Sequence, residues 1–324
     1  MASVSGQLKD ASVNGKPRDL MDVIFNIAPT DTPFLSMCGK AEATQTLHEW
    51  QTETLAAPAA NSNYEGADVS TFAEISSTEL ANRTQILIKA ISVSGTAQAV
   101  KQAGVDRQYA HQMAQRAKEL KKDLEFALLG NVLSVVETPN SVTRKMGGLP
   151  TWLWDNNNLG SGGSAPVYGS SAASSGTSRA VTEAMCTGLM TDIYTAGGNP
   201  DRIMVSPKVR TLLSKVLHGN ATRMEHVEDK KAYSTIDVWV SDFGTLKIVP
   251  NRVQAGVTYS KYAAFFLDPD YWKVAYLRGF QEQELGRTGD GKKGYMLVEA
   301  TLQASQPSSS GMVADISDTA SDYA

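Results

Sequence analysis

The residues that could bind a cofactor or carry catalysis are few and scattered in this chain of 324 residues. The stretch Gly289–Gly294 has the glycine spacing of a dinucleotide-binding loop. Such a loop must follow a strand and open a helix, so that phosphate meets the helix N-terminus. Here a strand-like run, Tyr295–Leu302, follows instead. The pattern therefore favours a hairpin turn over a nucleotide site.

The four histidines are also poorly placed for metal binding or acid–base catalysis. His218 and His226 lie in a polar stretch with no cysteine nearby, which favours solvated side chains over zinc ligands. His48 stands next to Glu49 in a strand-like run, where neighbouring side chains point to opposite faces. The sequence has no nucleophile elbow, Walker A loop or zinc-protease helix motif. We therefore expect no catalytic residues, no cofactor and no metal.

Composition narrows the class of protein further. Hydrophobic residues make up 42% and charged residues 20%, which is typical of a globular chain with a sizeable core. A net charge of -4 gives no electrostatic basis for tight binding to nucleic acid or to an anionic membrane. No run approaches the roughly 20 apolar residues of a membrane span. Cys38 and Cys186 flank or enter apolar helical runs and are expected to be buried thiols in a reducing cytoplasm.

A long amphipathic helix, expected between about Gly104 and Val136, is the element around which the chain is organised. Apolar side chains recur at helical spacing, at Tyr109, Met113, Ala117, Leu120, Leu124, Ala127 and Leu128. Asp106 is placed to cap its first turn, and no Pro or Gly interrupts it before Gly130. The interleaved charges are expected on a solvated face; they are Lys118, Glu119, Lys121, Lys122, Asp123 and Glu125.

Two thin segments precede this helix. Residues 1–40 predict an N-terminal arm with a short helix over Arg18–Ile27 and a helical turn in which Thr32 caps and Pro33 begins. Residues 41–96 predict an extended β-hairpin, with strands at 46–53 and 83–96 around a polar tip. A lone two-stranded ribbon is marginal in water. We therefore expect the arm to pack against another part of the molecule or against another molecule, and the hairpin to lie on a neighbouring subunit.

The remainder divides into an α/β part and a strand-rich part, giving an α+β chain overall. The long helix and the start of a peripheral domain fill 97–150, and 151–234 predicts a compact α/β domain with a Gly/Ser-rich insertion at 155–178. In that domain Ser178 is expected to cap a helix, and a short strand at 202–205 precedes a second helix. Residues 235–324 predict several strands, followed from Ser305 by a polar tail.

This order of elements resembles the major capsid protein of tailed bacteriophages, the HK97-like fold. That family has an N-terminal arm, an extended loop, a spine helix, and axial and peripheral domains. The resemblance rests on the runs Ile27–Phe34, His48–Trp50, Tyr64–Gly66 and Lys118–Glu125, and on Thr143-Arg144 with Gly147-Gly148-Leu149. It covers nearly the whole chain and is clearest over residues 18–150.

The resemblance implies a structural subunit made in the bacterial host cytoplasm and incorporated into the virion. Hexamers and pentamers would form an icosahedral head around double-stranded DNA, which the wall would contact only non-specifically. The expected partners are other copies of the chain, a portal protein, a separate scaffolding protein and a cement or decoration protein; no membrane is involved. The candidate contact residues are Phe34, Trp50, Tyr64, Glu65, Phe72, Lys89 and Arg144. We expect Trp50→Ala to weaken assembly more than the subunit fold.

The sequence departs from the family in one feature with a chemical consequence. Some members join subunits by an isopeptide bond from a loop Lys to an Asn. This chain has no Lys between Ala41 and Ile88; Lys40 and Lys89 stand only at the ends of the hairpin. We therefore expect non-covalent assembly.

Two other functions fit the sequence less well. One is another oligomeric virion protein, such as a tail or decoration component, which would form rings or tubes. The other is a cytoplasmic α/β enzyme with its site near Gly286–Gly294 and the pair His218 and His226. An enzyme would remain a small oligomer and would be stabilised by its ligand.

Overall fold

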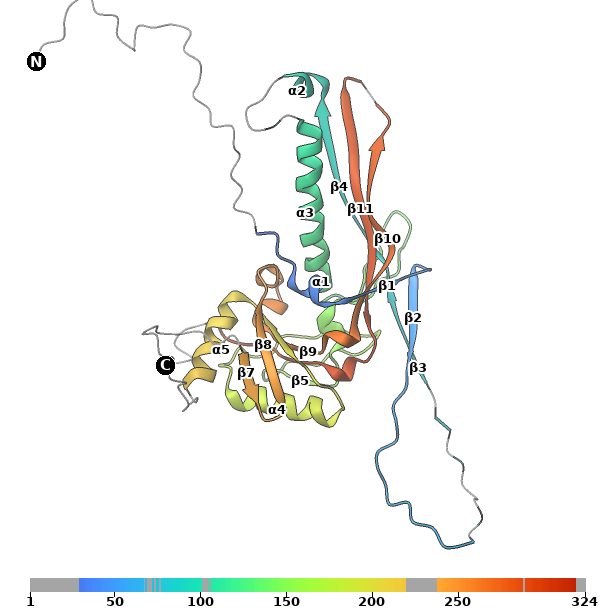
Figure 1. The fold of residues 1–324 in the computed structure, drawn as a ribbon, viewed down its shortest axis with the longest axis vertical. Coiled ribbons are helices and arrows are strands. Elements are labelled where there is room, and N and C mark those ends of the chain that lie inside the picture. Colours follow the sequence, from blue (N-terminus) through green and yellow to red (C-terminus); the bar gives the residue numbers. More distant parts are fainter. Residues whose placement is uncertain are drawn as a thin grey trace, which may run out of the picture.

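The computed structural model describes residues 29–66, 68, 72, 74–75, 77–100, 105, 107–219, 238–287 and 289–318. Within them the chain forms a column, a body and a long loop that leaves the junction between the two (Figure 1). The expected helix at Arg18–Ile27, the Asp106 cap and His226 lie outside the described residues.

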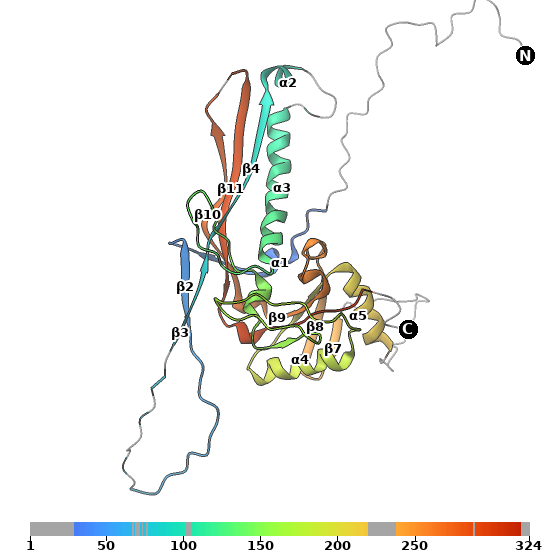
Figure 2. The same ribbon diagram turned by 180° about the vertical axis from the view of Figure 1, so that it is seen from behind.

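The column consists of the long helix α3 (Gln108–Leu128) against a four-stranded sheet, as the views from both sides show (Figures 1 and 2). The strand order is β1-β10-β11-β4, in which only β1 and β10 run parallel. These strands are β1 (Gly39–Glu42), β4 (Gln85–Ser94), β10 (Trp272–Leu285) and β11 (Gly291–Ala304). The short helix α2 (Gly95–Ala99) follows β4 at the far end of the column.

Helix α3 is shorter than the sequence predicts but buries the expected stripe. Its buried side chains include Tyr109, Met113, Leu120, Leu124 and Leu128. After Gly130 the chain continues as an irregular excursion, held by a bridge between Val135 and Lys145. It returns at Gly148, where an added Cβ would lie 1.9 Å from the carbonyl oxygen of Gly130. Glycine is therefore required for this close approach to the end of the helix.

The extended loop contains a two-stranded ribbon whose second strand differs from the prediction. Strand β2 (Leu47–Thr52) pairs antiparallel with β3 (Thr78–Arg83). Most of the run 83–96, expected as the returning strand, is instead β4 of the column (85–94), which pairs with β11. Both runs are strand-like, and periodicity alone does not say which partner each takes. In Figures 1 and 2 the ribbon points away from the column.

The body is built on a six-stranded mixed sheet in the order β5-β12-β9-β6-β8-β7. Its strands are β5 (Asn157–Asn158), β6 (Arg202–Val205), β7 (Val238–Ser241), β8 (Gly244–Pro250), β9 (Ala264–Leu267) and β12 (Gly311–Val313). Helices α4 (Glu183–Thr195) and α5 (Pro207–Gly219) share one hydrophobic core with one face of this sheet. The other face joins the core that contains the lower half of α3 and the short helix α1 (Pro33–Met37). Strand β9 is consequently buried on both faces.

Short 3-10 helices make several of the connections. They are η2 (Leu149–Trp152), η3 (Gln254–Gly256), η4 (Ser260–Tyr262), η5 (Pro269–Tyr271) and η6 (Pro307–Ser309). Among the described residues, no helix has both the length and the apolar character that spanning a membrane requires.

Two expectations for the body are wrong. Helix α4 begins after Thr182, whose hydroxyl accepts the amide of Met185, so Ser178 is not its cap. The segment from Ser305 is not a free polar tail, because β12 lies inside the sheet between β5 and β9. Its polar neighbours Ser309, Ser310 and Ser317 are buried as well. The backbone pairing of β12 with β5 and β9 buries this segment although many of its side chains are polar.

Candidate functional site: the extended loop and the joint at its root

The loop exposes large apolar side chains that nothing else in the described chain covers. The part between β2 and β3, residues 53–77, is called the loop tip here. The exposed fractions are 81% for Leu55, 89% for Tyr64, 85% for Phe72 and 64% for Ile75. Glu65, beside Tyr64, is also exposed. An apolar group on a thin, projecting element is a feature of protein–protein contact surfaces.

Two of the other candidate contact residues pack inside the subunit instead. Phe34 is fully buried, with its ring edge-on to Trp272 at 6.2 Å between centroids. Trp50 is half-buried; its indole N–H donates to the carbonyl oxygen of Ala304 at 2.8 Å, and its ring lies tilted against that of Trp152, with 5.2 Å between centroids. These contacts join the arm and the ribbon to the subunit's own core.

At the root of the loop the chain passes from one sheet to another through Thr84 alone. Strand β3 ends at Arg83 and β4 begins at Gln85. Thr84 is fully buried and uses all of its polar groups. Its amide donates to the carbonyl oxygen of Thr46 at 2.9 Å, its carbonyl oxygen accepts Arg144 Nε at 2.6 Å, and its hydroxyl donates to Glu299 Oε1 at 2.9 Å.

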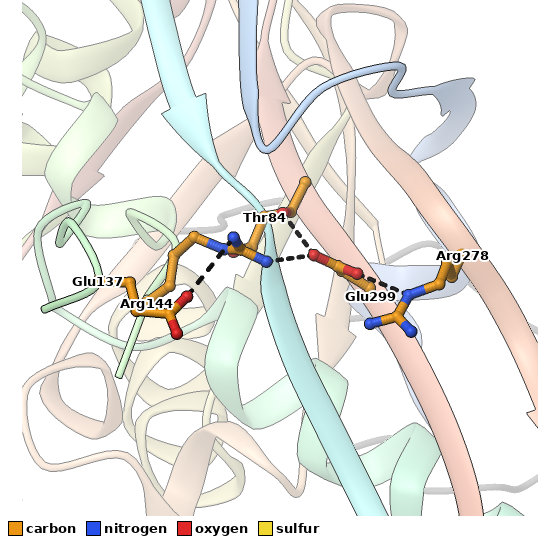
Figure 3. A network of polar contacts seen from close by, with 5 residues as sticks. All are labelled: Thr84, Glu137, Arg144, Arg278 and Glu299. Carbon is orange, nitrogen blue, oxygen red and sulfur yellow. Dashed lines mark hydrogen bonds and ion pairs between the residues drawn. The ribbon is translucent and has the colours of Figure 1, made fainter. Parts of the chain in front are cut away.

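Glu299, on β11, is the centre of this network (Figure 3). Its Oε1 accepts Thr84 and pairs with Arg144, while its Oε2 accepts Arg278 Nε at 2.7 Å. Arg144 also lies 3.7 Å from Glu137, which is on the irregular excursion after α3. The side chains of Glu299 and Arg144 are only 3% and 13% exposed. Removing one partner of such a buried pair typically costs about 3–5 kcal/mol. We call Thr84, Arg144, Arg278 and Glu299 the joint.

Asn82 provides a second attachment two residues before Thr84. Its amide nitrogen donates to the carbonyl oxygens of Gly147 at 3.1 Å and Leu302 at 2.7 Å. Its side-chain oxygen accepts the amide of Gly147 at 2.8 Å. Asn82 and Thr84 thus both bond to residues of β11, Leu302 and Glu299. The last part of β3 is thereby fixed to the excursion after α3 and to β11.

The arm has a comparable attachment where it enters the body. Glu125 of α3 is completely buried, although its place among charged residues predicts a solvated side chain. Its carboxylate accepts the amides of Phe34 at 2.8 Å and Leu35 at 2.7 Å, and the Asn251 side chain at 2.6 Å. Burial raises the pKa of this carboxyl, and the three donors oppose the rise. Glu125 thus caps α1, and Thr32 provides no side-chain cap.

The structure therefore divides the predicted contact residues into two groups. Tyr64, Glu65 and Phe72 are free on the loop tip, whereas Phe34, Trp50, Lys89 and Arg144 bond within the subunit. Lys89 pairs with Asp123 of α3 at 2.8 Å. The sequence analysis did not identify Leu55, Ile75, Glu125 or Glu299. For Glu299 the available signal was a single acidic residue in an otherwise apolar strand, whereas Glu125 lies among charged residues that gave no such signal.

The structure also describes other groups considered from sequence, among them Gly289, Gly291 and the two cysteines. Gly289 and Gly291 lie at the turn between β10 and β11, as the following strand predicted. Both cysteines are buried and free. In the described part of the chain, no three His, Cys, Asp or Glu side chains gather as metal ligands would.

Comparisons with known proteins show the family to which the chain belongs. The sequence model of the SU10 major capsid protein family matches residues 4–317. The chain belongs to the SU10 major capsid protein family. It is 28% identical over 337 residues to the major capsid protein of Escherichia phage Phieco32, covering 93% of this chain and 94% of the relative.

Solved structures place this capsid subunit in the HK97-like fold. The capsid asymmetric unit of cyanophage A-1(L) matches with a TM-score of 0.64 at 12% identity, covering 95% of this chain and 98% of that one. A chain from Mycobacterium phage Bobi matches with a TM-score of 0.63 at 12% identity and the same coverage. The subunit is a component of the virion shell, and its family implies a structural role.

Proposed function

We propose that copies of this capsid subunit join mainly by docking the loop tip of one subunit on the surface of a neighbour. The observation that carries the proposal is the group of four exposed apolar side chains at the loop tip, on a ribbon fixed to the subunit. The ribbon alone cannot bury these side chains. A second copy supplies the missing surface in every subunit, and head-to-tail contacts of this kind close into rings.

The column offers a suitable receiving surface. Ile86 and Ile88 on β4 and Leu285 on β10 are 41%, 53% and 45% exposed. The strand register places them on one face of the sheet, because Ile88 lies opposite Leu297, and Leu285 opposite Lys293. Helix α3 packs on the other face, against Ile91. Apolar side chains on the outer face of the column are thus available to a neighbour's loop tip.

The rest of the assembly is proposed as follows. Hexamers and pentamers enclose double-stranded DNA, which the mildly acidic wall contacts only non-specifically. Contacts are non-covalent, because the nearest lysine, Lys89, is at the root of the loop and is paired with Asp123. A portal protein, a separate scaffolding protein and a cement or decoration protein complete the particle.

Electron microscopy after size-exclusion chromatography tests the docking proposal. We expect wild-type subunits, with phage lysate added as a source of scaffolding protein, to form shells or rings of five or six. The double variant Tyr64→Ser/Phe72→Ser should remain unassembled with an unchanged melting temperature. Tyr194→Ser, which removes an aromatic side chain that is 57% exposed on α4, is the control outside the loop. Normal assembly of the double variant would contradict docking through the loop tip.

A further inference from the structure

The joint lies where the chain changes from the ribbon to the column, and it contacts both. Thr84 is bonded through its amide, its carbonyl oxygen and its hydroxyl to three different segments. The side chain of Asn82 is also hydrogen-bonded, to Gly147 and Leu302. These bonds restrict rotation of the end of β3 relative to β4. The backbone at the root of the loop is therefore held in a defined direction by these bonds.

The pairing of the long strands β10 and β11 is irregular near the joint. The register shifts between Tyr276 and Arg278, and again between Arg278 and Gln281. Such bulges bend a strand and re-aim its side chains. Between the two shifts, Arg278 pairs with Glu299 across the strands and donates to its carboxylate. The bend of the column and the root of the loop thus meet at one carboxylate.

Stability alone does not explain a buried ionic network at this position. Apolar side chains of the same volume are often at least as stabilising as a buried ion pair, because of the cost of desolvating the charges. A carboxylate that accepts from three fixed directions adds geometric specificity, which apolar packing lacks. We propose that Glu299 and Arg144 are positioning residues that set the angle at which the extended loop leaves the subunit, and thereby the curvature with which copies join.

The loop acts as a lever that amplifies small rotations at the joint. The six paired residues of β2 and β3 span about 20 Å at the usual strand rise. A rotation of about 10° would move the far end of the ribbon by about 3 Å, and the loop tip further. That displacement is enough to separate side chains from the surface they dock on. The effect on shells rests on the proposed docking function, whereas the effect on the loop angle does not.

Spin-label distance measurements on unassembled subunits test the angle directly. The native cysteines are buried, so labels can be attached at Glu53→Cys, at the far end of the ribbon, and Ser92→Cys on β4. We expect a single narrow distance distribution in the otherwise unchanged protein. In Glu299→Gln, the new side-chain amide group faces the donors of Thr84, Arg144 and Arg278 and cannot accept from all of them. The distance distribution should therefore become at least about twofold broader or shift by about 3 Å. Glu119→Gln, which removes an exposed carboxylate of α3 paired with Arg116, should leave it unchanged.

Thr84→Val removes only the hydroxyl bond to Glu299 and keeps the side-chain shape. It should broaden the same distribution by a smaller amount, and it decides the question if Glu299→Gln does not fold. Identical distributions in wild type and Thr84→Val, and in Glu299→Gln where that variant folds, would overturn the positioning role.

Cryo-electron microscopy of assembled particles tests the second half of the proposal. We expect Glu299→Gln and Thr84→Val subunits with normal melting behaviour to form shells of mixed diameter or open sheets, and wild type and Glu119→Gln to form one size. A broadened loop angle with an unchanged single shell diameter would overturn the link to curvature while leaving the positioning role intact. Normal assembly of the loop-tip variants would refute the docking function separately.

Discussion

At the scale of single residues, the buried carboxyl of Glu125 links the stability of the fold to pH. Burial raises the pKa of its carboxyl above the unfolded value of about 4.3. The native state therefore binds this proton more tightly than the unfolded chain. Its contribution to the free energy of unfolding is fully present below the unfolded pKa and is lost as pH rises through the native pKa.

Urea unfolding of dissociated subunits between pH 4 and pH 7 can measure this effect. The free energy of unfolding of wild type minus that of Glu125→Gln should fall as pH rises, because only wild type titrates at this position. At neutral pH the variant should still be less stable, by about 1–3 kcal/mol, since its amide faces the donors of Phe34 and Leu35. A difference in the free energy of unfolding that stays constant or grows with pH would show that the pKa of the Glu125 carboxyl is not raised in the native state.

At the scale of elements, the structure changes what is expected of Trp50. Its indole N–H donates to the carbonyl oxygen of Ala304 and its ring packs against Trp152, so it attaches the β2–β3 ribbon to its own subunit. Trp50→Ala should lower the free energy of unfolding by about 2 kcal/mol, less than the 3–5 kcal/mol of a fully buried Trp. Tyr64→Ala on the loop tip should change it by less than about 0.5 kcal/mol. Chemical denaturation of unassembled subunits measures both, and equal stabilities for the two variants would contradict this assignment.

The elements themselves were largely predictable, because their periodicity is local. The stripe from Tyr109 to Leu128 identified α3, and the alternation of Ile91 and Val93 with serines identified β4. Strand pairing was not predictable, because 83–96 is equally suited to a hairpin and to a column strand. The burial of β12 was missed for a related reason. Its serine-rich surroundings look solvated, and only pairing with β5 and β9 explains their burial.

In the candidate site, too, residues with a local sequence signal could be predicted, and residues that depend on distant partners could not. Tyr64 and Phe72 could be predicted from sequence because large apolar groups in a polar connection have nothing local to pack on. Glu299 could not, because its partners come from β10, the Thr84 linker and the excursion after α3, far apart in the sequence. A lone acidic residue in an apolar strand indicates that a buried partner exists but does not identify it.

At the scale of the whole molecule, the absence of lysine between Ala41 and Ile88 predicts that particles separate completely into single chains. Mature particles boiled in detergent should give one band at the monomer mass, near 34.8 kDa. Dimers, pentamers or higher ladders that survive this treatment would demonstrate a covalent link. Denaturing gel electrophoresis of purified particles measures this. Both cysteines are buried free thiols, so the gel should look the same with and without reducing agent.

The interior position of β12 has a consequence for the timing of folding during synthesis. Strands β6, β8 and β9 can pair as soon as they leave the ribosome, but β5 lies on the far side of β12. It has no sheet partner until translation has passed Val313, more than 150 residues later. The exposed loop tip is made early, while the body beside it is still incomplete. Translation therefore separates in time the synthesis of the exposed loop tip from the completion of the body sheet.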